Sequence, residues 1–259
     1  MYHDTNDSAA DLLKLVVQRG PYLAALADGV TEKRALAAEH DASRSTIDRA
    51  IRELDEAGLV DRGHGSVALT LRGRLALATY EDFRERLVGL EAASNVLETI
   101  PDDAFIHSDF LADANVVDAT LHTPQRPIDA IEDVLADATH VQTLATSVLP
   151  DVLSVYRDRI VDGSLSADVV VTPDVLDVLV ADYHGPMNDM LCAGRLELHL
   201  TDDVLPYGLV VASNDAGDVA LLVCGETSIA GVVENKTPTA VEWARERFEA
   251  AKTAATRLA

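Results

Sequence analysis

The stretch from Thr31 to Leu69, TEKRALAAEHDASRSTIDRAIRELDEAGLVDRGHGSVAL, decides the fold of the N-terminal part of the chain. It predicts two short helices joined by a tight turn. The first helix starts at the capping hydroxyl of Thr31 and breaks at residues 41–42; Ser43 caps the second helix, which Gly58 ends. Apolar residues recur in the second helix at the spacing of one buried face, namely at Ile47, Ala50, Ile51 and Leu54.

The residues after the second helix predict a hairpin. Residues 59–62 and 66–69 have the pattern of short strands, and Gly63 and Gly65 supply the positive φ angles that a tight turn needs. Two helices, the second polar and rich in arginine near its start, followed by a hairpin, form the pattern of a winged helix-turn-helix. In that arrangement the second helix enters the major groove of DNA. The sequence therefore predicts a module that binds double-stranded DNA.

Each candidate DNA contact follows from its position in this module. Hydroxyl groups at the start of the second helix can donate hydrogen bonds to phosphate, and arginine can bind the edge of guanine. Cations beyond the helix can bind the DNA backbone. We expect Ser43 and Thr46 on phosphate, Arg44, Ser45 and Arg49 on base edges, Arg52, Arg62 and Arg72 on the backbone, and His64 at the tip of the wing. The alternative is a winged helix that packs against a protein partner and binds no DNA.

The net charge of -23 is unusual for a DNA-binding protein, and it is unevenly distributed over the 259 residues. Residues 1–86 carry a net charge of -3, and residues 87–259 carry -20. The chain has 29 Asp, 15 Glu, 17 Arg and only 4 Lys. Short, strongly hydrated carboxylates with few lysines favour a protein that works in molar salt. The sequence thus indicates a halophilic protein; the alternative is an acidic protein that mimics DNA or docks on a basic partner.

The chain shows no sign of export or of membrane insertion. The N-terminus lacks a basic and apolar signal segment, and no apolar run reaches the length of a membrane span. Cys192 and Cys224 form no CxxC pair and no disulfide framework. We expect a cytoplasmic protein with no membrane partner.

Helical patterns flank the winged module on both sides. Residues 8–28 predict a helix interrupted at Gly20-Pro21. Residues 71–97 predict a long helix that places Leu75, Tyr80, Phe83, Leu87, Leu90 and Val96 inside. We expect this long helix to pair with its symmetry mate in a homodimer, although packing on its own chain is equally consistent with the pattern. The DNA-binding domain is thus expected at residues 1–98 and a second domain at 99–259.

The second domain alternates between strands and helices. Residues 116–120 predict a short strand, and from residue 128 onward helices and strands alternate up to a hairpin turned at residues 214–217 and a closing helix over 238–257. Such a pattern is typical of an α/β sheet that is parallel in its first half and antiparallel in its second. The fold class is therefore α+β: a winged helix-turn-helix followed by an α/β domain.

Several short motifs carry a resemblance to a known family. They are FLADA at 110–114, LPYGLV at 205–210, VEN at 233–235 and AVEWA at 240–244. With the order of elements, they make the chain resemble haloarchaeal winged-helix regulators of the TbsP type, named as a suppressor of the sugar regulator TrmB. The resemblance implies a regulator of genes of central carbon metabolism, with a C-terminal domain similar to a degenerate half of phospholipase D.

Catalytic and metal-binding patterns are missing from the sequence. Phospholipase-D chemistry needs His-x-Lys, which does not occur, and the chain has no Gly-x-Ser-x-Gly, Walker or Gly-x-Gly-x-x-Gly motif. The spacing of His184, Cys192, His199 and Cys224 matches no zinc pattern. We expect neither an enzyme nor a bound metal or cofactor.

A small metabolite remains a candidate effector. In a parallel sheet, ligands bind where the strands end, and there the chain has Thr146, Ser147 and Thr172. The same residues are ordinary helix caps, which is the simpler interpretation. Tyr207, Asn235 and Lys236 are further candidates, although Asn235 could equally cap the turn before Pro238. A phosphorylated ligand would need a cation, for which Arg157, Arg159, Arg195 and Lys236 are the available sources.

Overall fold

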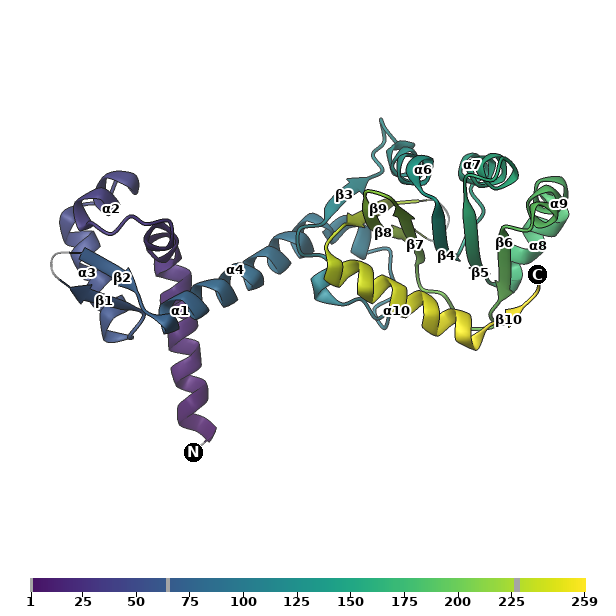
Figure 1. Ribbon diagram of the computed structural model, residues 1–259. Coiled ribbons are helices and arrows are strands. Elements are labelled where there is room, and N and C mark those ends of the chain that lie inside the picture. Colours follow the sequence, from purple (N-terminus) through teal and green to yellow (C-terminus); the bar gives the residue numbers. More distant parts are fainter. Residues whose placement is uncertain (1, 64–65, 226–228) are drawn as a thin grey trace. The chain divides into compact units, whose positions relative to one another are not determined.

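The computed structural model describes residues 2–63, 66–225 and 229–259, and it divides the chain into two compact units (Figure 1). The first unit comprises residues 1–85 and the second residues 86–259. Each unit has its own apolar core. Within the described residues, no helix is both long and apolar enough to cross a membrane.

The first unit begins with one continuous helix, α1 (Tyr2–Ala27). The expected interruption at Gly20-Pro21 is wrong, because Pro21 lies inside α1. Val16 before the proline and Leu23 after it are both buried in the same core, so tertiary packing holds the helix together across the lost hydrogen bond. Gly20 lies against the ring of Tyr80, where a Cβ would come within 2.9 Å of Cε1.

The two short helices of the first unit are α2 (Lys33–Glu39) and α3 (Arg44–Glu56). The apolar face expected for α3 is confirmed, since its four residues are fully buried. The turn between the helices contains Asp41 with a left-handed φ of 45°. The cap expected at Thr31 is wrong: α2 begins two residues later, and the Thr31 carbonyl instead accepts the backbone N–H of Val67 at 2.9 Å.

The expected hairpin is present as β1 (Val60–Gly63) and β2 (Ser66–Leu69), paired antiparallel from Val60↔Leu69 to Gly63↔Ser66. The residues between these strands, His64 among them, lie outside the described part of the chain. Leu59, Val60 and Val67 are buried against the helices. Hydrophobic packing therefore fixes the hairpin to α3.

The long helix is α4 (Leu71–Ala92), followed by the short α5 (Ser94–Leu97). The expectation that its apolar residues are inside is wrong for Leu75, Phe83, Leu87 and Leu90, which are 44–61% exposed. In contrast, Leu77 and Val96 are buried, as expected for Val96. A surface helix has only a limited face in contact with its own core, so α4 carries more apolar residues than that face can hold.

The division between the units falls within α4, after Glu85, and not after Glu98 as expected. The last turns of α4 and all of α5 pack on the second unit: Arg86 Nε lies 2.5 Å from Asp109 Oδ1, and Val96 is fully buried there. Gly89 approaches the Leu111 carbonyl so closely that a Cβ would stand 1.8 Å from its oxygen. These contacts explain why residues 86–98 belong to the α/β unit.

The second unit is built on a mixed sheet, which confirms the expected parallel and antiparallel halves. Among the described residues the sheet has eight strands in the order β10-β6-β5-β4-β7-β8-β9-β3. β4, β5 and β6 are parallel, whereas every other pair is antiparallel. The strands are β3 (Asn115–Asp118), β4 (His140–Ala145), β5 (Ser166–Val171), β6 (Leu196–Leu200), β7 (Gly208–Asn214), β8 (Gly217–Cys224), β9 (Gly231–Asn235) and β10 (Thr256–Arg257).

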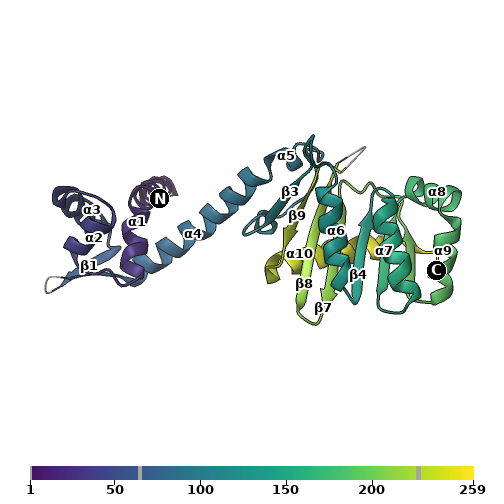
Figure 2. The same ribbon diagram turned by 90° about the horizontal axis from the view of Figure 1, so that it is seen from above.

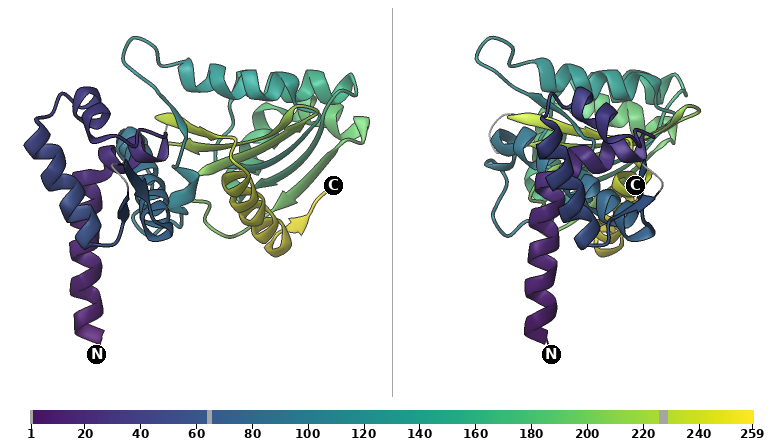
Figure 3. Two further views of the ribbon diagram at one scale, coloured as in Figure 1. Left: turned by 60° about the vertical axis from the view of Figure 1, so that its left-hand side comes forward. Right: turned by 90° about the vertical axis from the view of Figure 1, so that its left-hand side faces the viewer.

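Helices cover both faces of this sheet (Figures 2 and 3). One face carries α6 (Arg126–Asp137), α7 (Pro150–Val161), α8 (Pro173–Asp182) and α9 (His184–Ala193). The other face carries α10 (Pro238–Ala254) together with the 3-10 turn η1 (Ser108–Phe110). The closing helix ends three residues before the expected position, because Thr256 and Arg257 pair with β6 as an edge strand that the sequence pattern did not reveal.

Candidate nucleic-acid interface and regulatory site

The start of α3 carries a cluster of hydroxyl groups. Ser43 caps the helix by accepting the backbone N–H of Thr46 at 3.2 Å, as expected from the sequence. Its Oγ also lies 2.8 Å from Ser45 Oγ and 2.8 Å from Thr46 Oγ1. Three exposed hydroxyls therefore surround the positive end of the α3 dipole, an arrangement that can hold an anion such as a DNA phosphate.

Three arginines expected to contact DNA lie on the exposed side of α3. Arg49 Nε donates to Glu53 Oε1 at 2.9 Å and is 70% exposed, whereas Arg52 Nε is 3.9 Å from Glu56. Arg44 is exposed and makes no ion pair among the described residues. The protein therefore holds all three guanidinium groups weakly or not at all, because exposed ion pairs contribute little to the stability of a fold.

Glu53 has a second and better partner. Arg19 of α1 donates to Glu53 Oε2 through Nε at 3.0 Å and Nη2 at 2.7 Å, and its side chain is only 18% exposed. The two arginines together hold the pKa of Glu53 below its usual range, the Arg19 hydrogen bonds being the larger cause. Arg49 can therefore leave Glu53 without stranding an unpaired carboxylate.

The exposed side of α3 also carries a carboxylate. Asp48 accepts from Lys33 Nζ at 2.7 Å, and this hydrogen bond, with the nearby Lys33 and Arg44 charges, lowers its pKa. Lys33 belongs to α2, so the pair ties the exposed sides of the two short helices together. The surface is therefore mixed in charge and not a broad basic patch.

The arginines beyond α3 are engaged in the fold itself. Arg62 of β1 pairs with Asp55 of α3. Arg72 Nη1 donates to the Ala57 carbonyl at 3.0 Å, where it caps the end of α3, the end of the dipole that favours a cation. Arg72 thus has a structural task that the sequence did not indicate, and its phosphate contact stays a prediction, as does that of His64.

The candidate effector residues fall into three separate places. Thr146 and Ser147 follow β4 and line a cavity between the sheet and α7, α8 and α9. Thr172 precedes α8 at the end of β5; it makes no capping hydrogen bond with its side chain. These three residues thus lie at the carboxyl ends of neighbouring parallel strands, as expected.

Tyr207 and Asn235 are instead built into the core of the opposite face. The Tyr207 hydroxyl donates to the Phe105 carbonyl at 2.8 Å, and burial raises its pKa. Asn235 is 1% exposed, and its Nδ2 donates to the carbonyls of Phe110 at 2.9 Å and Ala112 at 2.6 Å. Its Oδ1 accepts the Thr237 N–H at 2.7 Å, so the expected turn-capping alternative is present.

The remaining candidate, Lys236, is 67% exposed and its Nζ lies 2.8 Å from Glu234 Oε1. The two residues line a separate surface groove with Asn115, Arg126 and three aspartates of α6. The groove is predominantly acidic, which disfavours an anionic ligand. Tyr207, Asn235 and Lys236 therefore do not join Thr146 and Ser147 in one site.

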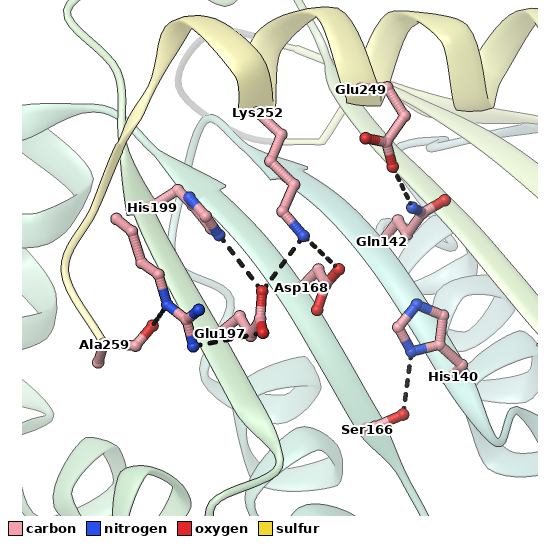
Figure 4. Close-up of polar contacts among 10 residues, drawn as sticks. His140, Gln142, Ser166, Asp168, Glu197, His199, Glu249, Lys252 and Ala259 are labelled. Carbon is pink, nitrogen blue, oxygen red and sulfur yellow. Dashed lines mark hydrogen bonds and ion pairs between the residues drawn. The ribbon is translucent and has the colours of Figure 1, made fainter.

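A row of polar side chains lies between α10 and the sheet (Figure 4). Lys252 Nζ contacts Asp168 Oδ2 at 2.7 Å and Glu197 Oε2 at 3.3 Å, and Arg257 Nη2 lies 3.3 Å from Glu197 Oε1. His199 Nε2 is 3.7 Å from Glu197, beyond hydrogen-bond length. Asp168 and Glu197 each have a cation, and Glu249 of α10 accepts from Gln142 Nε2 at 2.9 Å, so the row serves to fasten α10 and β10 to the sheet.

Sequence reasoning missed this row and two hydroxyls of the cavity. Thr143 Oγ1 and the Tyr156 hydroxyl lie 2.6 Å apart on the cavity side, the one on β4 and the other on α7. The alternation of β4 could have revealed Thr143, because it shares a face with Val141 and Ala145. Among the described residues, no group of His, Cys, Asp and Glu is placed to hold a metal ion.

The geometry describes a protein of two parts, a helical unit with a hairpin and an α/β unit with a cavity at the ends of its parallel strands. A family model described as the middle domain of the methanogenesis regulatory protein FilR1 matches residues 124–254, and one described as the HVO_A0261 N-terminal domain matches residues 7–93. Because the first match covers just over half of the chain, the chain belongs to the family of this regulatory protein.

Solved structures with some likeness to the chain are distant. TrmBL2, described as an archaeal chromatin protein with a novel mode of DNA binding, is 14% identical over 96% of this chain and 99% of its own, with a TM-score of 0.42. Nuc, a phospholipase D family member from Salmonella typhimurium, is 11% identical over 56% of this chain and 97% of its own, with a TM-score of 0.43. At such scores neither likeness supports an argument, and the similarity to phospholipase D stays a prediction. No curated protein shows significant similarity to the chain.

Proposed function

We propose that the protein is a transcriptional regulator whose first unit is a winged helix-turn-helix that binds double-stranded DNA through α3 and the β1–β2 wing. The observation that carries the proposal is α3 itself. One side of this helix is fully buried, and the other presents the hydroxyl cluster at its start followed by Arg44, Arg49 and Arg52. Membership of a family of regulatory proteins supports the same conclusion.

The energetics of the arginine contacts are compatible with DNA binding. Arg49 would exchange an exposed pair with Glu53, which contributes little, for a bidentate contact to guanine, which contributes roughly 1–3 kcal/mol of discrimination. Glu53 would keep Arg19. Arg62, which lies on the wing and outside α3, would contact the DNA backbone and contribute equally at every sequence.

The test compares three matched arginine variants in a DNA-binding titration by fluorescence anisotropy. The DNA would be a promoter fragment recovered by chromatin immunoprecipitation, set against random DNA of the same length. We expect Arg49→Ala to lose about 5- to 150-fold in affinity for the promoter fragment and little for random DNA. Arg62→Ala should weaken both alike, and Arg84→Ala, an exposed arginine on α4, should change neither.

Two results would overturn this proposal. If Arg62→Ala abolished the sequence preference while Arg49→Ala weakened both DNAs alike, the assigned roles would be wrong. If immunoprecipitation recovered no discrete promoter fragments and the chain bound no DNA, the first unit would instead be a module that binds a protein partner.

We also propose that the regulator is a homodimer formed through α4. Support comes from the apolar residues that α4 leaves exposed, in particular Phe83, Leu87 and Leu90 at helical spacing. Contiguous exposed apolar residues of this kind mark interaction surfaces. In analytical ultracentrifugation we expect a dimer that becomes a monomer in the Leu87→Glu variant; a monomeric wild-type chain would contradict the proposal.

The acidic composition supports a halophilic protein, and the resemblance to TbsP-type regulators supports target genes of central carbon metabolism. In dilute buffer, unscreened repulsion among carboxylates should loosen the fold. At 1 M salt the Debye length is only about 3 Å, so this repulsion is screened. We expect far-UV circular dichroism to show loss of structure below about molar KCl. Chromatin immunoprecipitation with and without sugar would test both the targets and sensing: peaks away from genes of central carbon metabolism would contradict the targets, and occupancy that is independent of sugar would contradict sugar sensing.

A further inference from the structure

The cavity that Thr146 and Ser147 line has a volume of about 120 Å³. It lies between the parallel strands and the helices α7, α8 and α9, next to the ends of β4 and β5. Val152 and Tyr156 of α7, Val175 of α8, and Met187 and Met190 of α9 form its helical wall. The strand side is equally apolar, so the wall is almost entirely hydrocarbon.

The lining of this cavity offers water few hydrogen-bond partners, although its volume could accommodate several water molecules. Protein interiors rarely contain voids much larger than a water molecule, and an unfilled void lowers stability. A buried water needs two to four polar partners. The cavity offers its hydroxyls in only two places, the Thr143–Tyr156 pair and the strand end at Thr146 and Ser147.

The Thr143–Tyr156 pair leaves one hydrogen-bond donor unused. The two hydroxyl groups have two hydrogens between them, and their mutual contact at 2.6 Å uses one. Burial raises the pKa of Tyr156 to about 12, so its hydroxyl keeps its proton at neutral pH. One O–H can therefore donate to an acceptor oxygen on a ligand.

The lining also excludes the charged ligands considered from the sequence. None of the expected cation sources lines the cavity. Arg157 pairs with Asp189, Arg159 donates to the Leu135 carbonyl, and Lys236 pairs with Glu234 elsewhere. A phosphate would be buried there without a counter-charge, and the many hydroxyls of a sugar would lose their hydrogen bonds to water.

We propose that the cavity of the second unit binds a compact, uncharged and mainly apolar molecule with a single acceptor oxygen. Its apolar body would be similar in size to benzene, which an apolar cavity of about 150 Å³ is known to hold. The acceptor would meet the free O–H of the Thr143–Tyr156 pair. Binding itself does not depend on the proposed function; only the role of this molecule as the effector rests on it.

The test uses the full chain in molar KCl and the methyl groups of its methionines as NMR probes. The chain has 3 Met, and two of them, Met187 and Met190, line the cavity. Cyclohexanone, titrated into methyl-labelled protein, should shift the signals of Met187 and Met190 saturably. No shift, or a linear shift of both signals, would overturn the proposal. A saturable shift of Met187 and Met190 by glucose or glycerol 3-phosphate would show that the ligand class is wrong.

Two variants separate the apolar from the polar part of the site. Val152→Phe fills the cavity and should weaken cyclohexanone binding at least tenfold. The double variant Thr143→Val/Tyr156→Phe removes both hydroxyls, and it should weaken cyclohexanone about three- to tenfold while leaving cyclohexane unaffected. Equal losses for both probes in the double variant would contradict the assigned hydrogen bond.

These measurements contain no DNA, so failure of the DNA-binding proposal would leave them unchanged. A fluorescence signal from Trp243, the one tryptophan of the chain, checks that each variant is folded, because Trp243 is buried on the opposite face of the sheet. A variant that lost this signal would be replaced by Val175→Phe, which fills the same cavity from α8.

Discussion

The two faces of the central sheet come from the same strands but differ in how their polar side chains are used. Towards α10, Asn235 holds two backbone carbonyls and Lys252 pairs with two carboxylates, whereas among the described residues His199 Nε2 and Trp243 Nε1 are buried there without a hydrogen-bond partner. Towards α7, α8 and α9, the hydroxyls of Thr143 and Tyr156 contact only each other, beside an apolar cavity. The face towards α7, α8 and α9 therefore differs in having a cavity beside its unused donor.

This difference teaches how to rank polar residues that look equally functional in a sequence. Asn235 and Ser147 are both polar residues at a strand end, and both were candidates for an effector. The deciding observation is whether the hydrogen-bonding capacity of a buried group is already satisfied within the chain. A satisfied group stabilises the fold, whereas an unused group beside a cavity is free to bind a ligand.

The variant with the largest expected effect removes hydrogen bonds on the face of the sheet that α10 covers. Asn235→Ala leaves the Phe110 and Ala112 carbonyls and the Thr237 N–H without their partner, which should lower the free energy of unfolding by about 2–4 kcal/mol. Urea unfolding followed by Trp243 fluorescence measures this directly, because Trp243 packs against Phe110 with ring centroids 5.0 Å apart.

The matched control for this variant is Asn115→Ala. Asn115 is exposed and donates only to Glu234 Oε2 at 3.1 Å, so its loss should cost less than about 0.5 kcal/mol. If the two asparagine variants had the same stability, Asn235 would not be a structural residue, and it would return to the list of effector candidates.

A second experiment uses pH to test whether the Tyr156 hydroxyl is buried on the face that α7, α8 and α9 cover. Burial raises the pKa of Tyr156 to about 12 in the folded chain, against an ordinary value of 10.0. Since the folded pKa is the higher one, the stabilisation is fully present below pH 10 and is lost as the pH rises to 12. The shift corresponds to roughly 2–3 kcal/mol. Urea unfolding between pH 9 and 12 should show a greater loss in the wild type than in Tyr156→Phe, in which Tyr207 and Cys224, whose pKa values burial also raises, still contribute. Parallel curves would mean that the Tyr156 hydroxyl is reached by water.

Local patterns in the sequence predicted most elements of both units. The four apolar residues of α3 recur at helical spacing, and all are buried because local periodicity and the tertiary core agree there. The local pattern gave wrong predictions where contacts between residues far apart in the sequence determine the structure. Pro21 stays within α1 because residues on both sides of it share one core, and Phe83 and Leu87 are exposed because α4 has more apolar residues than its own core can cover.

The candidate sites were less predictable for the same physical reason. The sheet order places β7 beside β4, and no local signal in the sequence fixes that neighbour. Lys252 and Asp168 are 84 residues apart along the chain, so their pairing emerges only when α10 folds over the sheet. The residue types at the strand ends could thus be predicted from the sequence. Which of these side chains lack a hydrogen-bond or ion-pair partner within the chain depends on the fold.

The smallest expected effect concerns the ion row under α10. Lys252 and Asp168 are 23% and 19% exposed, and partly buried pairs are screened less by salt than exposed ones, so replacing Lys252 by Met should cost about 1 kcal/mol in molar KCl, more than an exposed pair contributes. Lys236→Met is the matched control, because Lys236 is 67% exposed in its pair with Glu234 and its loss should be near zero. Lys252 and Arg257 also lower the pKa of Glu197, the hydrogen bond from Lys252 being the larger cause, so the cost of Lys252→Met should decrease as the pH falls through the folded pKa of Glu197 and this carboxylate takes up a proton. Urea unfolding at pH 7 and at acid pH, followed by Trp243 fluorescence, would measure both effects. A cost that persisted unchanged in acid would show that the stem of Lys252 stabilises α10 by apolar packing and that its charge contributes nothing.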